Sequence, residues 1–221
     1  MFKRYMFKRK IINFLFSLYI NLMEVPMKKM SALFLALLLT AGSVSSQTTW
    51  ELDKVHTNVM FTVSHMVVAE VTGNFTDFDA SITGTKADYS DAQAAMTIKV
   101  ASISTDNEKR DGHLRSDDFF AADKFPEITF KSKSFKKTGD NTYKITGDFT
   151  MRGVTKTIEL DAKYKGEIND PWGNTKSGWK VTGTINRFDY GVNWNKAIET
   201  GGIVVGQEVD ITINAEFAKK K

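Results

Sequence analysis

The residues best able to do chemistry are three histidines, His56, His65 and His113, in a chain of 221 residues without cysteine. Imidazole can act as a general base, ligate a metal or donate a hydrogen bond. His56 and His65 have opposite parity along a strand, and neither belongs to an H-E-x-x-H motif. The missing cysteines exclude thiolate zinc sites, iron–sulfur clusters and cysteine nucleophiles. Because the chain also has no G-x-S-x-G elbow and no glycine-rich phosphate loop, we expect no enzyme, metal site or cofactor.

A second group of candidates is Arg110, His113 and Arg115, which stand close together in the sequence. Guanidinium forks match phosphate oxygens bidentately, so this group could bind a phosphorylated ligand. Neighbouring carboxylates could instead pair with these cations on a solvated segment, namely Asp111, Asp117 and Asp118. Both interpretations remain open at this point.

Arg187 and Asp189 have the same parity as Trp179 and Ile185 on a predicted strand, which would turn both inward. A buried Arg–Asp pair requires good geometry and further hydrogen bonds. A bulge near Asn186 would instead turn the pair outward. The second arrangement is the one we expect.

The elements that must position these residues are strands, because most of the chain alternates apolar and polar residues with a period of two. Such strands bury one face, and no helical segments are available to cover it, so the sheet must either close into a barrel or fold into a sandwich. Strands of about ten or more residues, such as 157–168 and 177–190, favour the barrel. We therefore expect an all-β fold: a single antiparallel β-barrel of about eight strands with one short helix near 108–120, capped by Asp106 or Asn107. The predicted strands are residues 48–53, 57–65, 71–82, 94–102, 127–135, 141–151, 157–168, 177–190 and 208–217.

The apolar faces of these strands combine large aromatic residues with glycines such as Gly73, Gly147 and Gly183. An eight-stranded barrel can be filled by its own side chains or can hold one small ligand. The glycines favour a cavity, although they could equally mark bulges or bends. The residues predicted to line the cavity are Phe61, Val63, His65, Phe75, Phe130, Tyr143, Phe149, Tyr164, Trp179 and Ile211.

The first 46 residues are typical of a targeting segment. Residues 27–46 have a short basic start, an apolar run and small residues near Ser46, which predicts a Sec-type signal peptide and an exported mature domain over 47–221. The apolar run is too short for a transmembrane helix. We interpret residues 1–26 as an over-called extension, with translation starting at Met27; an extended basic start is the alternative.

The charge of the chain is concentrated in this leader. Of 30 Lys/Arg and 26 Asp/Glu, seven bases and one acid lie in residues 1–46, which leaves the mature domain with a net charge of −2. The domain also lacks a basic stripe. We therefore expect no nucleic-acid partner.

Several blocks of the sequence, in order, resemble the YceI-like family. They are residues 50–66, 71–78, 110–120, 125–132, 147–156 and 187–191, and they include Phe125-Pro126-Glu-Ile-Thr-Phe130 and Arg187-Phe188-Asp189-Tyr190-Gly191. The resemblance covers 48–218. The chain departs from the family pattern at Met151-Arg152, where a leucine is common before the glycine.

This resemblance implies a lipocalin-like barrel in the periplasm that carries an isoprenoid lipid, either a prenyl quinone or a polyprenyl phosphate, in an apolar cavity. His65 would then reach the head group, or bond a backbone carbonyl at its strand end. Arg110, His113 and Arg115 would bind the head group at the barrel mouth. The alternative is a secreted stress-response or interaction protein with a packed barrel. The resemblance leaves open a transient membrane contact and a monomeric or dimeric state.

Overall fold

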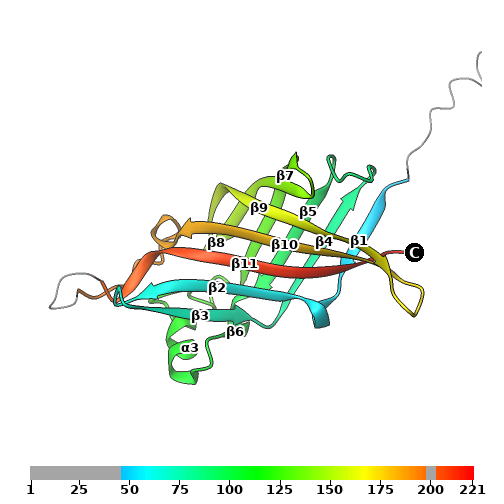
Figure 1. The fold of residues 1–221 in the computed structure, drawn as a ribbon. Coiled ribbons are helices and arrows are strands. Elements are labelled where there is room, and N and C mark those ends of the chain that lie inside the picture. Colours follow the sequence, from blue (N-terminus) through cyan, green and yellow to red (C-terminus); the bar gives the residue numbers. More distant parts are fainter. Residues whose placement is uncertain (1–45, 198–202) are drawn as a thin grey trace, which may run out of the picture. The chain divides into compact units, whose positions relative to one another are not determined.

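The computed structural model describes residues 46–197 and 203–221, which form eleven strands, one α-helix and three 3₁₀ turns (Figure 1). The strands are β1 (Thr48–Leu52), β2 (Asn58–His65), β3 (Ala69–Phe75), β4 (Phe78–Gly84), β5 (Gln93–Lys99), β6 (Ile103–Ser104), β7 (Glu127–Gly139), β8 (Thr142–Met151), β9 (Val154–Asn169), β10 (Thr175–Asn186) and β11 (Val205–Lys219). The helix is α3 (Glu108–Arg115), and the turns are η1 (Lys54–His56), η2 (Val100–Ser102) and η3 (Arg187–Tyr190). The predicted extension over 1–26 and signal peptide over 27–46 lie outside the described residues, apart from Ser46.

Eight strands close into an antiparallel barrel in the order β1-β4-β5-β7-β8-β9-β10-β11, and β11 pairs back to β1. β11 is long enough to have two partners on one edge. Its last residues pair with β1, and its first part pairs with β2, which continues through β3 to β6. The predicted all-β barrel of about eight strands with a short helix is confirmed, with three additional strands beside it.

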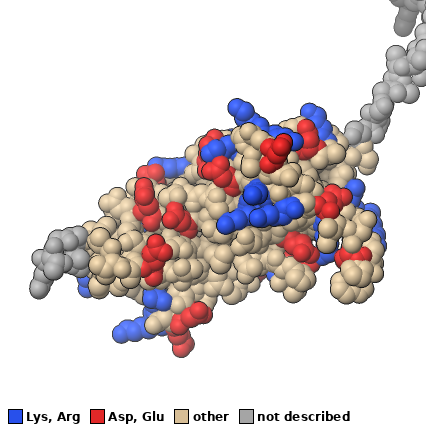
Figure 2. Space-filling model, in the orientation of Figure 1, with Lys and Arg blue, Asp and Glu red and all other residues tan. Residues whose placement is uncertain are grey.

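The alternation of apolar and polar residues in the sequence corresponds to the inner and outer faces of the barrel. On β8, Tyr143, Ile145, Phe149 and Met151 are all buried. Between them the outward-facing Lys144 forms ion pairs across to two carboxylates of β9, at 2.9 and 3.0 Å. Figure 2 shows such basic and acidic side chains interspersed over the outer surface of the strands. Apolar burial inside and mixed charge outside together select the barrel.

The structure corrects four predicted boundaries. The predicted strand 94–102 ends at Lys99, because residues 100–102 form the turn η2. The run 71–82 is two strands, β3 and β4, because the chain turns at residues 76–77. The last part of 177–190 is the turn η3, for which the Asn186 side chain accepts a hydrogen bond from Phe188 N. The helix begins after the Asn107 cap and ends at Arg115, because Ser116 bonds back to the His113 carbonyl through both its N–H and its hydroxyl.

The inner glycines make room for large side chains of neighbouring strands. The space that a Cβ of Gly73 would occupy is filled by the Phe61 ring, and that of Gly147 by the Phe130 ring. At Gly183 the Leu160 side chain approaches instead. These glycines therefore allow close packing of bulky side chains on the inner wall, and they do not create the cavity by leaving empty space.

Gly147→Ala and Gly183→Ala should differ sharply in stability. At Gly147 the new methyl would stand 2.6 Å from the Lys131 backbone oxygen, whereas at Gly183 it would overlap only the movable Leu160 Cδ2 methyl. We expect Gly147→Ala to cost about 3 kcal/mol and Gly183→Ala less than about 1.5 kcal/mol, because overpacking against backbone cannot relax by a rotamer change. Urea unfolding measures both, and equal costs would contradict this account.

A cavity inside the barrel

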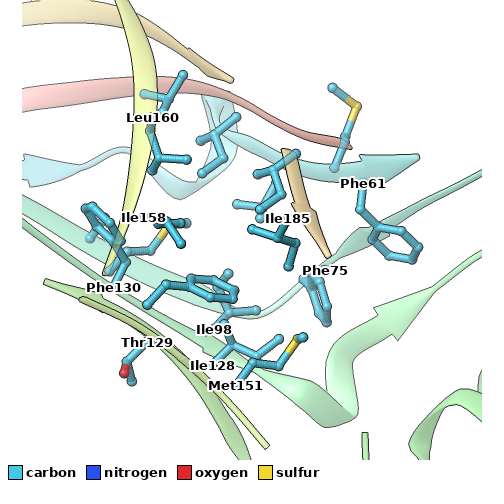
Figure 3. A pocket seen from close by; sticks show the side chains of 18 of the residues that line it. Phe61, Phe75, Ile98, Ile128, Thr129, Phe130, Met151, Ile158, Leu160 and Ile185 are labelled. Carbon is cyan, nitrogen blue, oxygen red and sulfur yellow. The ribbon is translucent and has the colours of Figure 1, made fainter. Parts of the chain in front are cut away.

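The barrel encloses a cavity of about 190 Å³. In Figure 3, side chains from several strands point into it, among them Phe61, Phe75, Phe130, Ile158 and Ile185. Its wall draws on all eight barrel strands, on β2 and β3, and on the segment containing α3. A single continuous space therefore runs along the barrel interior and contacts both of its hydrophobic clusters.

The wall of this cavity is almost entirely apolar. Among its described residues the only hydroxyl groups are those of Ser81 and Thr129, and the only charged group is that of Arg187. An apolar cavity of about 150 Å³ is large enough to bind benzene and stays free of water. Transfer of hydrocarbon from water into such a space is favourable by about 0.8 kcal/mol per CH₂ group. The geometry is that of a binding site for an apolar chain.

The two ends of the cavity are built differently. At one end the α3 segment contributes Leu114, Phe119 and Phe120 to the wall. Trp194 packs behind them, with its ring centroid 5.1 Å from those of His113 and Phe119. At the other end an aromatic cluster fills the barrel, namely the buried Trp50, Tyr89, Phe135, Tyr143 and Trp179 with the half-buried Tyr164.

The structure places seven of the predicted lining residues on the cavity wall: Phe61, Val63, Phe75, Phe130, Phe149, Trp179 and Ile211. Three others do not reach it. His65 lies at the last position of β2, opposite Val205. Tyr143 and Tyr164 are held in the aromatic cluster, where the Tyr143 hydroxyl donates to the Asp88 carbonyl at 3.0 Å. The periodicity indicated the correct face, but it could not show how far along the barrel the cavity extends.

None of the residues predicted to bind a head group lies on the cavity wall. The Arg110 guanidinium donates to the Thr105 hydroxyl at 2.7 Å and the Thr105 carbonyl at 2.8 Å. Arg115 donates to the carbonyls of residues 101 and 103. His113 pairs with Asp118 at 2.8 Å. Leu114 is the residue of α3 that faces the cavity, so the helix turns its cations away from it.

Arg187 is the functional candidate that sequence reasoning misplaced. The prediction turned Arg187 and Asp189 outward together, but η3 separates them: Arg187 is buried against the cavity, and Asp189 is exposed and pairs with Lys156 at 3.0 Å. A 3₁₀ turn changes the direction of successive side chains by about 120°, so strand parity does not apply there. The signal in the sequence that could have placed Arg187 correctly was its inward parity along the predicted strand.

A charged cluster lies on the outside of the barrel where β1 passes into β2. The Asp53 carboxylate caps η1 and also pairs with Lys176 Nζ at 2.6 Å, and Lys176 contacts Glu216 at 3.2 Å. Asp53, His56 and Glu216 come close enough together to hold a cation. The Lys176 ammonium already provides one, so this cluster acts as a clamp between strands.

This clamp predicts a pH dependence of stability. The hydrogen bond from Lys176, followed by that from His56, lowers the pKa of Asp53, and the same contact raises the pKa of Lys176. The contribution of Asp53 is thus fully present above its unfolded-state pKa of about 4 and is lost as the pH falls below it; that of Lys176 is lost above about pH 10. Asp53→Asn should be less stable than the parent protein between about pH 5 and 10, and the difference should narrow progressively as the pH falls from about 4 toward the lowered pKa of Asp53.

Asp79→Asn is the matched control for this measurement. Asp79 pairs with Lys54 at 3.6 Å, but both side chains are exposed, 70% for Asp79. Exposed pairs contribute little to stability. Urea unfolding of the three proteins at about pH 2, 7 and 9 measures the effect, and a difference that persists unchanged at the lowest pH would show that Asp53 acts only through its neutral capping bonds.

Comparison with known proteins gives consistent results. Residues 50–217 match the family model of the YceI-like domain. A UPF0312 protein of Staphylococcus aureus strain N315 is 40% identical over 172 residues, covering 77% of this chain and 98% of that relative. The Campylobacter jejuni YCEI protein is 35% identical, with a TM-score of 0.62 over 77% of this chain and 97% of its own.

Two more distant structures share the fold. Burkholderia cenocepacia BcnA is 23% identical, with a TM-score of 0.66 over 75% of this chain and 98% of its own. A polyisoprenoid binding domain from Saccharophagus degradans is 15% identical, with a TM-score of 0.56 over 77% of this chain and 98% of its own. At these identities the likeness shows the barrel and nothing further.

Proposed function

This chain belongs to the YceI-like family, and from that premise we propose that it is a non-catalytic carrier that holds an isoprenoid lipid in its barrel. The observation that carries the proposal is the apolar cavity of about 190 Å³, whose wall offers hydrocarbon along nearly its whole surface. The polyisoprenoid binding domain with the same fold supports a prenyl chain as the guest. Binding is then physical: the chain leaves water for the cavity, and polar groups at one end orient its head.

We further propose that the carrier acts in the periplasm, with the prenyl group of a quinone or a polyprenyl phosphate as cargo. The signal-peptide pattern in residues 27–46 supports export. Within residues 46–197 and 203–221, no helix is long and apolar enough to cross a bilayer.

The decisive experiment is mass spectrometry of an organic-solvent extract from the mature domain, purified from the periplasm of its own host. We expect a prenyl lipid at close to one molecule per protein. Addition of prenyl quinone or prenyl phosphate to the delipidated protein is the second arm. An empty extract together with no uptake in this arm would instead support a secreted interaction protein that has no stable ligand.

We also propose that the carrier exchanges its cargo at a lipid surface through the β2–β3 hairpin. Met66, Val67 and Val68 form its tip and are 43%, 70% and 89% exposed. Met66 and Val67 have φ of 51° and 67°, a conformation that a β-branched residue adopts only at a cost. β2 leads directly from this tip to Phe61 and Val63 on the cavity wall.

Replacing the tip with Met66→Ser, Val67→Asn and Val68→Ser should weaken binding to phosphatidylcholine vesicles more than tenfold, because each buried apolar side chain contributes about 1.5–3 kcal/mol. Asparagine tolerates positive φ, so the variant should keep its fold. Val55→Ser is the matched control, since Val55 is 87% exposed but lies on η1, away from the hairpin. Vesicle co-sedimentation measures the effect, and equal binding of all three proteins would rule out the hairpin as the contact.

A further inference from the structure

The cavity has one charged side chain among its described lining residues, Arg187. It begins η3, directly after β10 ends, and is 4% exposed. Val192 and Val205 also line the cavity, and the carbonyl groups that hold the guanidinium come from Val192 and Trp194 after η3 and from the first two residues of β11. The guanidinium also lies over the Phe188 ring, with Cζ 4.7 Å from the ring centroid, so a positive charge stands at the edge of a cavity whose described wall is otherwise nearly all apolar.

The backbone holds this guanidinium in a fixed orientation. Nε donates to the Gly206 carbonyl at 2.7 Å, and Nη2 donates to that of Val205 at 3.0 Å. Nη1 donates to the carbonyls of Val192 at 2.6 Å and Trp194 at 2.9 Å. A guanidinium has five N–H donors. One N–H of Nη2 therefore has no acceptor among the described residues.

The charge also has no carboxylate partner among residues 46–197 and 203–221. The carboxylate nearest in sequence, Asp189, pairs with Lys156, and at the same end of the barrel Asp118 pairs with His113. Carbonyl groups offer only partial negative charge, and burial lowers the pKa of Arg187. A buried charge without a counter-ion is costly, and an anion placed beside it would relieve that cost.

We propose that Arg187 binds the anionic head group of the guest, a phosphate or a carboxylate, at the end of the cavity beside α3. This inference rests on the proposed function and narrows it to amphiphiles that have one apolar chain and an acidic head. A charge-assisted bond from the free N–H, with the nearby guanidinium charge, favours an anion over a neutral head of the same size. At the other end, the buried groups of the described residues that lack a hydrogen-bond partner are neutral, namely Trp179 Nε1, Tyr89 Oη and Ser177 Oγ.

The first test needs only the parent protein. Calorimetric titration compares farnesyl phosphate with farnesol, and palmitate with hexadecanol, so that each pair differs in its head group alone. We expect the two anions to bind at least tenfold more tightly than their matched alcohols. Equal affinities within each pair would overturn the role of Arg187 while leaving the apolar carrier intact. If none of the four compounds bound, the carrier function itself would fail.

Two charge-removing variants assign the preference to one residue. Arg187→Gln should equalise each anion with its alcohol and leave the alcohol affinity within about twofold. Arg115→Gln is the matched control: it removes a guanidinium from the same end, but from a residue outside the cavity wall, and should keep the tenfold preference. A preference for the anions that survives in Arg187→Gln would overturn the proposal. Loss of the preference in both variants would also overturn it, because the preference would then come from the summed positive charge at this end and not from Arg187.

A second measurement decides the matter if Arg187→Gln does not fold. Palmitate labelled with ¹³C at its carboxyl group reports its own protonation by NMR when bound to the parent protein. A carboxylate beside the guanidinium should titrate below its pKa in water, because the cation stabilises the charged form. A carboxyl group in the apolar part of the cavity should titrate above it. A raised pKa would place the head away from Arg187 and refute the proposal.

Discussion

Val181→Trp should weaken binding of a prenyl chain by roughly a thousandfold. Val181 lies near the middle of β10, is partly buried and faces the cavity. An indole at this position would take the space of about one isoprene unit. Since each buried carbon contributes about 0.8 kcal/mol, loss of five carbons removes about 4 kcal/mol of binding free energy. Titration with a prenyl quinone measures the loss.

Lys180→Trp is the matched control, because it places the same ring one residue away on the exposed outer face of β10. It should bind the quinone as the parent protein does. Urea unfolding of both variants separates blocking from misfolding, since an overpacked core costs about 1–3 kcal/mol. If Val181→Trp folds and binds normally, the guest does not occupy the middle of the barrel, and the cavity model fails.

Trp179→Ala should destabilise the domain by about 3–5 kcal/mol. Trp179 is 3% exposed and lies at the centre of the aromatic cluster, with ring centroids 4.9 Å from Tyr164, 5.0 Å from Tyr89 and 5.4 Å from Tyr143. Removal of the indole would leave a void that the neighbouring rings, which belong to three strands and one loop, cannot all move to fill.

Trp179→Phe separates the ring from its polar atom. The Trp179 Nε1 has no hydrogen-bond partner among the described residues, and a buried unpaired donor costs about 1–3 kcal/mol. Phenylalanine removes this penalty and part of the packing together, so the net change should be below about 1 kcal/mol. Chemical unfolding of the two variants gives the comparison. If phenylalanine proved as costly as alanine, Nε1 would have to be bonded to a bound water or to the guest.

The amino-acid sequence by itself determined the barrel and its inner face. A period of two forces alternate side chains to opposite sides of a strand, and a sheet with no helices to cover its apolar side must form a barrel or a sandwich. The long strands favoured the barrel. Residues such as Phe61, Val63 and Ile211 could therefore be assigned to the interior from their positions alone. One edge of β11 pairs with two strands, β2 along its first part and β1 along its last residues. No pattern in the sequence indicated this shared pairing.

Only the tertiary structure decided where the cavity lies and which charge faces it. Tyr143, Tyr164 and Phe149 share the same inward pattern, but the two tyrosines pack into the aromatic cluster while Phe149 reaches the empty space. The distinction depends on distances between strands far apart in the sequence. For the same reason the sequence predicted Arg110 and Arg115, and not Arg187, as head-group ligands, whereas the structure places the first two off the cavity wall and buries Arg187 on it.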